Sequence, residues 1–174
     1  MIPLGLFVGT ASRWGWATDL AAGAAAGLLL IGLWEGMRRI AVFAELARRL
    51  ESEMSEMLGG LAPAQALALS ALSGFAEELF FRGAVQGSLG WLAAGILFAL
   101  LHTGPGPAFR VWSLYAALAG ALFGALMLWR GNLAAPIVAH FLVNAVNLRR
   151  LQRRWQSRGS AGGDAPRGPE LRVW

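Results

Sequence analysis

Two histidines and two adjacent glutamates are the residues of this chain best suited to proton transfer. His102 and His140 are its only histidines, and Glu77 and Glu78 are the carboxylates within its hydrophobic segments. A carboxylate beside an imidazole can take a proton from water, and further donors can stabilise an oxyanion. These residue types therefore indicate hydrolysis by an activated water molecule. The sequence contains no cysteine, which excludes thiol catalysis, disulfides and cysteine-based zinc sites.

The spacing of these residues predicts that they meet. Glu77 and His102 lie 12 and 13 residues from the middle of the turn that separates their helices. At 1.5 Å per residue, both lie about 18–20 Å from that turn. His140 lies about 12 Å beyond the next turn, and Asn144 follows at i+4 on the same helical face. We therefore expect one cluster of Glu77, His102, His140 and Asn144.

A second pair of charged residues stands next to this cluster. Glu78 and Arg82 are four residues apart, the order that suits an ion pair on a helix. A charged side chain in the middle of a bilayer costs about 2.5–3.5 kcal/mol on insertion scales, so an ion pair would offset much of this cost. The pairing would leave Glu77 as the carboxylate that is free for proton transfer.

The composition is that of a membrane protein. Hydrophobic residues make up 56% of the 174 residues and charged residues only 14%, and the mean hydropathy is +0.52. Soluble proteins average roughly 25% charged residues. This chain has too little polar surface to coat a small soluble domain, so we expect several membrane-spanning helices.

The hydrophobic pattern predicts an all-α integral membrane protein with about five transmembrane helices and one amphipathic interfacial helix. The five expected spans are Leu20–Trp34, Leu61–Ser88, Trp91–Leu101, Trp112–Trp129 and Leu133–Leu148. The segment Glu35–Leu58 has apolar residues at helical spacing between arginines and glutamates and predicts the amphipathic helix. We expect one domain over residues 1–148 and a basic, disordered tail over residues 149–174.

The arginines indicate how the chain is oriented. Seven of the 15 basic residues lie in the tail, and all 15 are arginine. Basic residues directly after a hydrophobic helix are typical of a cytoplasmic flank. This interpretation is favoured over nucleic-acid binding, so the lipid bilayer is the expected partner and nucleic acid is not. We expect a multi-pass protein of the cell (inner) membrane, with its C-terminal tail in the cytoplasm.

Three motifs in this order resemble a known protease family. Residues 77–82 read EExxxR, residues 98–102 read FxxxH and residues 140–144 read HxxxN, each within a hydrophobic segment. The ordered set, within residues 74–147, resembles the CPBP family of intramembrane proteases. That family includes CAAX prenyl endopeptidases and bacteriocin-processing proteins. The resemblance implies a helical membrane bundle with a catalytic cavity open towards the cytosol.

The resemblance also implies a role for each motif residue. The implied catalytic residues are Glu77, His102, His140 and Asn144, and the implied supporting residues are Glu78, Arg82 and Phe98. Glu77 and His102 would activate the attacking water. His140 and Asn144 would bind the oxyanion. The substrate would be a membrane-embedded or lipidated protein, cleaved near its C-terminus.

Metal dependence stays open at this point. Glu77, His102 and His140 have the ligand types of a His₂Glu zinc site. The sequence has no HExxH motif, and a Glu/His general base needs no metal. We therefore expect a metal-free enzyme, with zinc as the alternative.

Two other functions compete with proteolysis. A non-catalytic membrane scaffold or immunity protein would bind a peptide in the same cleft and would tolerate Glu77→Ala. A proton-coupled transporter would use Glu and His relays, but the chain shows no internal repeat of the kind transporters use. The Ala-, Gly- and Arg-rich composition favours a bacterial source.

Overall fold

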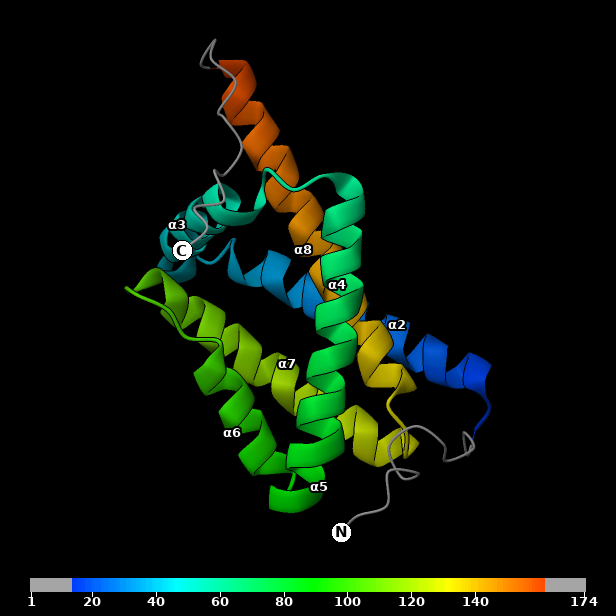
Figure 1. Cartoon of the computed structure of the whole chain (residues 1–174). Helices are drawn as coiled ribbons and strands as arrows, with labels where there is room; N and C mark the ends of the chain where they lie inside the picture. Colours follow the sequence, from blue (N-terminus) through cyan, green and yellow to red (C-terminus); the bar gives the residue numbers. More distant parts are fainter. Residues whose placement is uncertain (1–13, 162–174) are drawn as a thin grey trace, which may run out of the picture.

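Long apolar stretches form helices, and glycine-, proline- and asparagine-containing turns separate them (Figure 1). The structure, a computed structural model, describes residues 14–161, and this range contains no strand. The α-helices are α2 (Trp16–Met37), α3 (Ala41–Leu58), α4 (Pro63–Glu78), α5 (Gln86–Leu89), α6 (Trp91–Leu101), α7 (Ala108–Arg130) and α8 (Ala134–Ala161). A π-helix, η1 (Leu79–Val85), joins α4 to α5. The predicted all-α class is confirmed.

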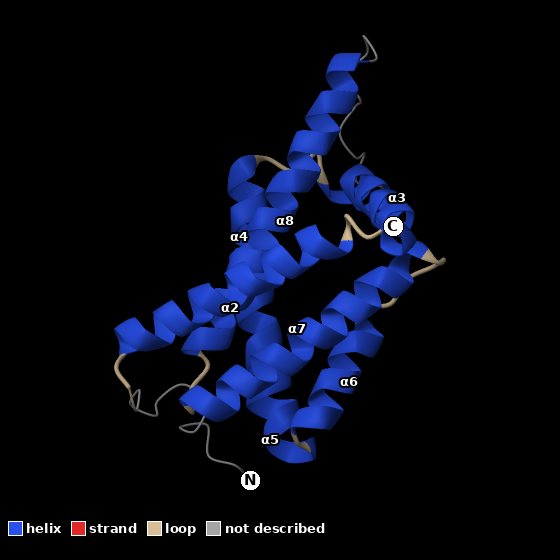
Figure 2. Cartoon of the chain, turned by 180° about the vertical axis from the view of Figure 1, so that it is seen from behind, coloured by secondary structure: helices blue, strands red, loops and turns tan. Residues whose placement is uncertain are grey.

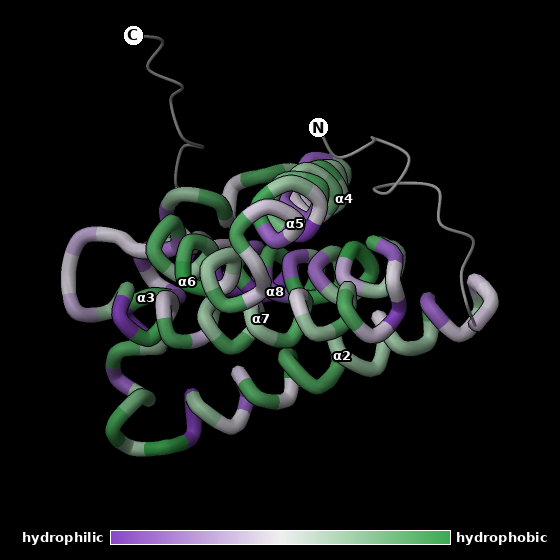
Figure 3. The backbone as a smooth tube through the Cα atoms, turned by 90° about the horizontal axis from the view of Figure 1, so that it is seen from below, coloured by the Kyte–Doolittle hydropathy of each residue, from purple (hydrophilic) through white to green (hydrophobic). Residues whose placement is uncertain are grey.

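Two of these helices, α2 and α7, are long and apolar enough to cross a membrane. The segments Ala41–Leu58 and Pro63–Leu89 pass the same test as a pair, but they are bent by 109° at the break between them. Helix α6 is apolar but has only 11 residues. Most of α2, α6 and α7 is coloured hydrophobic in Figure 3. The described residues thus offer two or three candidate spans, and the predicted count of five stays a prediction.

Helix α8 lies at the centre of the bundle, with α2 across one face and α4 across the other (Figures 1 and 2). The contact with α2 is made by glycines. A Cβ atom added to Gly23 would overlap the carbonyl oxygen of Ala135, and one added to Gly27 would lie 3.1 Å from the carbonyl oxygen of Ala139. The two backbones can approach this closely because both glycines lack a side chain.

Helix α4 approaches the other face of α8 in the same way. A Cβ atom at Gly74 would lie 3.2 Å from the backbone nitrogen of Phe141. Helix α4 begins with Pro63, which has no backbone N–H and so leaves no unpaired donor in the first turn. The side-chain oxygen of Gln65 accepts a hydrogen bond from the N–H of Ala62 (2.8 Å). The Gly74 contact places the end of α4 beside the first half of α8.

The main hydrophobic core lies between α2, α3, α7 and α8. Leu30, Tyr115 and Phe123 are each at most 2% exposed. The hydroxyl of Tyr115 donates a hydrogen bond to the carbonyl of Leu30 (3.2 Å), which satisfies its polar group inside the core. This core supports the face of α7 that is turned towards α8.

A buried polar cluster ties the start of α2 to the turn between α7 and α8. Gly131 ends α7 in the left-handed region at φ 73°, and Asn132 Oδ1 accepts the N–H of Ala134 (3.0 Å) at the start of α8. Asn132 and Arg130 both donate to the buried carboxylate of Asp19, at 2.9 and 2.5 Å. These two donors therefore compensate the negative charge of Asp19, which is buried away from solvent.

The predicted amphipathic helix is α3, which packs against α7 and α8. Three arginines of α8, each four residues from the next, pair with glutamates of α2 and α3. The pairs are Arg150–Glu35 (2.7 Å), Arg154–Glu51 (3.7 Å) and Arg158–Glu56 (3.0 Å). The last two pairs hold α3 against the C-terminal half of α8, and the first ties the end of α2 to the same half.

The same ion pairs explain why one prediction is wrong. Residues 149–161, expected to be disordered, are the helical continuation of α8 as far as Ala161. The segment is rich in Arg and contains two Gln, residues that favour helix, and three of its arginines gain partners on α2 and α3. The rest of the predicted tail, residues 162–174, lies outside the described residues.

Candidate active site

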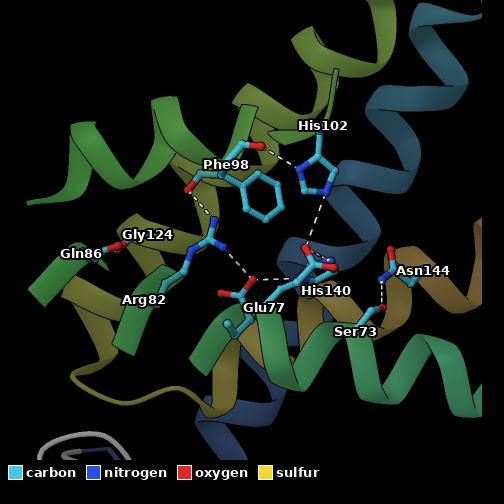
Figure 4. Close-up of polar contacts among 11 residues, drawn as sticks. Ser73, Glu77, Arg82, Gln86, Phe98, His102, Gly124, His140 and Asn144 are labelled. Atoms are coloured by element: carbon cyan, nitrogen blue, oxygen red, sulfur yellow. Dashed lines mark hydrogen bonds and ion pairs between the residues drawn. The ribbon is translucent and has the colours of Figure 1, made fainter. Parts of the chain in front are cut away.

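Glu77, His102 and His140 converge from three different segments (Figure 4). Glu77 lies near the end of α4, His102 directly follows α6, and His140 lies on α8. Glu77 Oε2 is 3.5 Å from His102 Nε2 and 4.0 Å from His140 Nε2. The convergence predicted from spacing is therefore confirmed.

The hydrogen bond at the far side of His102 fixes its ring. Nδ1 lies 2.7 Å from the carbonyl oxygen of Phe98, which can only accept, so Nδ1 carries a proton and donates it. The Phe98 ring also stacks on the imidazole, with ring centroids 4.2 Å apart. In neutral His102, Nε2 is then a proton acceptor that faces Glu77.

His140 is fixed by the predicted Glu78–Arg82 pair. Arg82 donates to Glu78 Oε1 over 2.9 Å, and His140 Nδ1 donates to the same oxygen over 2.8 Å. Glu78 is fully buried and Arg82 is 2% exposed. The ion pair is confirmed, and it also orients His140, a contact that the spacing alone does not predict.

The Nε2 atoms of both histidines therefore face the same carboxylate oxygen. That oxygen, Glu77 Oε2, is buried and has no hydrogen-bond donor within the described chain. With both histidines neutral and Glu77 present as the carboxylate, all three atoms are proton acceptors at this point. The arrangement is suited to taking one proton from a molecule bound among them and sharing it.

The environment of Arg82 explains how its charge is tolerated. Its second terminal nitrogen donates to the carbonyl of Gly120 (3.0 Å), and its guanidinium carbon lies 4.6 Å from the centre of the Phe98 ring and 5.2 Å from that of Phe123. One helical turn on, Gln86 donates to the carbonyl of Gly124 (3.1 Å). The two glycines of α7 thus present backbone acceptors as well as allowing close packing.

The π-helix η1 covers the stretch that contains Arg82. A π-helical turn holds one more residue than an α-helical turn, and such turns are frequent at functional sites. Arg82 lies within this π-helix and Gln86 directly follows it, and both buried side chains point towards α7. The side chain of Glu77, just before the π-helix, remains 32% exposed.

Asn144 lies one helical turn beyond His140. Its side-chain nitrogen donates to Ser73 Oγ on α4 over 2.8 Å. Asn144, His102 and His140 line the same small cavity of about 30 Å³. A water molecule needs roughly 10–15 Å³ of such volume, so the cavity has room for water. Three of the four predicted catalytic residues therefore line one cavity, and the fourth, Glu77, lies against the two histidines.

Three residues that belong to this site were not predicted. Ser73 holds Asn144, Trp112 lines the cavity, and Phe123 stacks on the His140 ring with centroids 5.1 Å apart. Ser73 lies four residues before Glu77, so its position on the same helical face was available from the sequence. In the sequence, nothing except their hydrophobic character distinguishes Trp112 and Phe123 as site residues.

The zinc alternative needs three ligands around one point. Within residues 14–161, no group of three or more His, Cys, Asp or Glu side chains is arranged to hold a metal ion. Both histidines already use Nδ1 for hydrogen bonds, which leaves Nε2 of each directed at Glu77. Metal independence stays a prediction.

Comparison with known proteins identifies the family. The family model described as type II CAAX prenyl endopeptidase Rce1-like matches residues 59–146, just over half of the chain. The chain belongs to the Rce1-like family. This confirms the resemblance, because Rce1-like proteins are intramembrane proteases that act on membrane-associated protein substrates.

One relative and the structural search add to this result. The chain is 39% identical over 83 residues to the uncharacterized protein YpbD of Bacillus subtilis (strain 168), a match that covers 45% of this chain and 41% of the relative. No solved structure gives a significant match. The Rce1-like region runs from the turn after α3 to the middle of α8 and includes all four predicted catalytic residues. Helices α2 and α3 and the second half of α8 lie outside it.

Proposed function

We propose that this chain is an intramembrane endopeptidase that hydrolyses a peptide bond near the membrane-associated C-terminus of a protein or peptide. The observation that carries the proposal is the orientation of Glu77, His102 and His140. In this Rce1-like chain the Nε2 atoms of both histidines face Glu77 Oε2, and hydrogen bonds hold the Nδ1 atom of each ring.

In the first step, a water molecule binds between Glu77 Oε2 and His102 Nε2. Its oxygen attacks the carbonyl carbon of the scissile bond while its proton moves to this pair. The Phe98 carbonyl keeps the proton of His102 on Nδ1, so Nε2 stays available as an acceptor. Glu77 and His102 thus act together as the general base.

His140 and Asn144 stabilise the oxyanion that the attack produces. Nδ1 of His140 already donates to Glu78, so His140 binds the oxyanion as the imidazolium. Its Nε2 proton is taken up from bulk water before the attack, and the Glu78 carboxylate stabilises the positive charge. Asn144 has a second amide hydrogen besides the one given to Ser73. The C–N bond then breaks, and the proton held by Glu77 and His102 passes to the leaving amine.

The proposed mechanism is metal-free. At 3.5 and 4.0 Å from Glu77 Oε2, the two histidine Nε2 atoms can contact the same bound water, and no step uses a Lewis acid. We expect the purified enzyme to keep its activity in EDTA and in 1,10-phenanthroline. Loss of activity in the chelator that returns with zinc would contradict the metal-free proposal.

The experiment compares the C-termini of membrane proteins by mass spectrometry in cells that carry the wild type, Glu77→Gln or Glu53→Gln. Glu53 is exposed on α3 and serves as the matched control. We expect Glu77→Gln to leave a set of proteins uncut, with a rate loss of about 10²–10⁴, and Glu53→Gln to behave as wild type. Unchanged C-termini, with the deletion phenotype rescued by Glu77→Gln, would favour the scaffold instead.

A further inference from the structure

The arginines in the second half of α8 lie on two different faces of the helix. Three of them point towards α2 and α3 and pair there with glutamates: Arg150, Arg154 and Arg158. Arg149 and Arg153 are exposed instead. Within the described part of the chain, neither of these two side chains has a hydrogen bond or an ion pair. We call Arg149 and Arg153 the arginine pair.

The face of α8 that carries the arginine pair is open to the surroundings. Helix α3 lies against the face with the ion pairs, and the segment before α4 lies against a second face, where Gln152 donates to the carbonyl of Leu61 (2.8 Å). Arg149, Arg153 and Gln156 recur at i, i+4 and i+7, which places them on one helical face, and all three are exposed. The arginine pair can therefore contact a molecule outside the bundle.

The arginine pair also lies at the level where the apolar part of the bundle ends. Helix α2 is a candidate membrane span, and Glu35 in its last turn pairs with Arg150, the neighbour of Arg149 (2.7 Å). At 1.5 Å per residue, the pair lies about 22 and 28 Å along α8 from Ala134, close to the roughly 30 Å thickness of the hydrocarbon core. In a bilayer, the groups found at this level are lipid headgroups.

The charges of the arginine pair favour an anion that bridges them. Like charges four residues apart on a helix repel each other, and an anion between them would remove this repulsion. Three glutamates near this part of α8 already pair with its other arginines: Glu35, Glu51 and Glu56. Guanidinium groups bind phosphate oxygens through parallel, charge-assisted hydrogen bonds. The phosphodiester of a lipid headgroup therefore matches the arginine pair in charge, in hydrogen-bonding chemistry and in level.

Apolar residues on the same face offer a surface for the acyl chains of such a lipid. Ala145 and Val146 lie one turn before Arg149 on this face and are half-buried. A lipid whose headgroup contacts the arginine pair can lay its chains along them. Its headgroup must carry a net negative charge, because the ammonium of a zwitterionic lipid would bring a further positive charge close to the two arginines.

We propose that Arg149 and Arg153 bind the phosphodiester of an anionic glycerophospholipid at the membrane surface. Both arginines lie outside residues 59–146, so membership of the Rce1-like family does not supply this site. The site contains no catalytic residue, and lipid binding can be tested apart from hydrolysis. His140 lies nine residues before Arg149 on the same helix, so a lipid that fixes the depth of the arginine pair also fixes the depth of His140.

The first experiment measures lipid binding by native mass spectrometry. The full chain, purified in detergent, is mixed with equal amounts of phosphatidylglycerol and phosphatidylethanolamine. Wild type is compared with Arg149→Gln/Arg153→Gln and with Arg48→Gln/Arg49→Gln. Arg48 and Arg49 are exposed on α3, and their substitution removes the same charge, but both pair with Glu45. They are therefore the matched control.

We expect wild type and the α3 control to retain phosphatidylglycerol in preference to phosphatidylethanolamine. One arginine near an anionic lipid contributes about fivefold in affinity, so the α8 double variant should bind phosphatidylglycerol about 30-fold more weakly. Equal losses in the two double variants would mean that only net charge matters, and equal retention of both lipids by wild type would exclude selection by headgroup charge. Either result would overturn the proposal.

The second experiment uses the unsubstituted protein, so it does not depend on the folding of a variant. Phosphatidylglycerol with a photoreactive group on its glycerol headgroup is irradiated with the protein in phosphatidylethanolamine vesicles. We expect the label on α8 between residues 145 and 157, and we expect unlabelled phosphatidylglycerol to displace it. Sodium phosphate at the same concentration should not displace it.

Two outcomes of the labelling experiment would contradict a lipid site. Label confined to other helices would place the bound lipid elsewhere on the molecule. Displacement by sodium phosphate as effective as displacement by phosphatidylglycerol would mean that the arginine pair binds a free anion, and the lipid assignment would be overturned. The thermal unfolding midpoint of the α8 double variant in detergent should equal that of wild type, because neither arginine has a partner within the described chain.

Discussion

Adjacent glutamates occupy opposite environments in this site. Glu78 is fully buried and shares one oxygen between Arg82 and His140, whereas Glu77 is partly exposed and faces the two histidine Nε2 atoms. The buried glutamate fixes the geometry, and the partly exposed one is free to exchange a proton. The roles of two identical side chains are thus set by their surroundings.

This difference predicts opposite effects of substitution on stability. Glu78→Gln removes the negative charge that compensates Arg82, and we expect a loss of about 3–5 kcal/mol in the free energy of unfolding. Glu77→Gln should leave stability nearly unchanged. Denaturant titration in detergent measures both. If Arg82→Gln added to Glu78→Gln fails to recover part of the loss, the ion pair is not the cause.

The hydrogen bond between Ser73 and Asn144 predicts that substitution of Ser73 lowers kcat. Ser73 holds the Asn144 amide but does not face the histidines, so it is a positioning residue. We expect Ser73→Ala to lower kcat about tenfold, less than the roughly 10²–10³ expected for losing a whole oxyanion donor, as in Asn144→Ala. Ser157→Ala, on the exposed end of α8, is the control. A Ser73→Ala effect confined to KM would contradict the role in orienting Asn144.

At this scale the sequence was informative about charge and spacing. The predicted convergence of Glu77 with the histidines and the Glu78–Arg82 pair are both present. The link from Glu78 to His140 was not predicted, because 62 residues separate them and no local spacing relates their side chains. Phe98 was predicted only as a supporting residue, although it contacts both Arg82 and His102.

Among the helices, hydrophobic runs located the elements but not their irregularities. The expected single helix Leu61–Ser88 is divided into α4, η1 and α5. At the π-helix, Arg82 and Gln86 donate hydrogen bonds to backbone carbonyls of α7. These are tertiary contacts, which the hydrophobic periodicity of the sequence cannot predict. The helical end of α8 likewise accompanies ion pairs to distant glutamates.

Alanine substitutions at two glycines of α2 are expected to change the stability of the protein in different directions. Gly23→Ala forces a methyl group against the Ala135 carbonyl, whereas nothing lies within 4 Å of a Cβ at Gly32 on the same helix. We expect Gly23→Ala to destabilise the protein by about 1–3 kcal/mol. Gly32→Ala should be neutral or stabilise it by up to about 1 kcal/mol. Thermal unfolding of the two variants tests this, and equal midpoints would contradict the close α2–α8 contact.

For the whole molecule, the arginine-rich C-terminal segment predicts how the protein is oriented in the membrane. The α5–α6 turn and the C-terminal end of α8 lie at opposite ends of the bundle (Figure 1). The sequence contains no cysteine, so single-cysteine variants report cleanly. We expect a membrane-impermeant maleimide to label Ser88→Cys in intact cells and Ser160→Cys only after lysis, because basic flanks stay in the cytoplasm. The reverse pattern would contradict a cytoplasmic tail.

The glycine contacts around α8 have a consequence for movement. His140 and Asn144 lie on a helix that α2 and α4 touch almost backbone to backbone, at Gly23, Gly27 and Gly74. Such a helix cannot shift sideways without a clash or a void. Helix α3 also packs through apolar side chains, but its ion pairs to α8 are partly solvent-exposed, and ions in solution weaken such pairs. The helix that carries His140 and Asn144 is thus held more tightly than α3, and we expect any widening of the bundle to come from α3 rather than from α8.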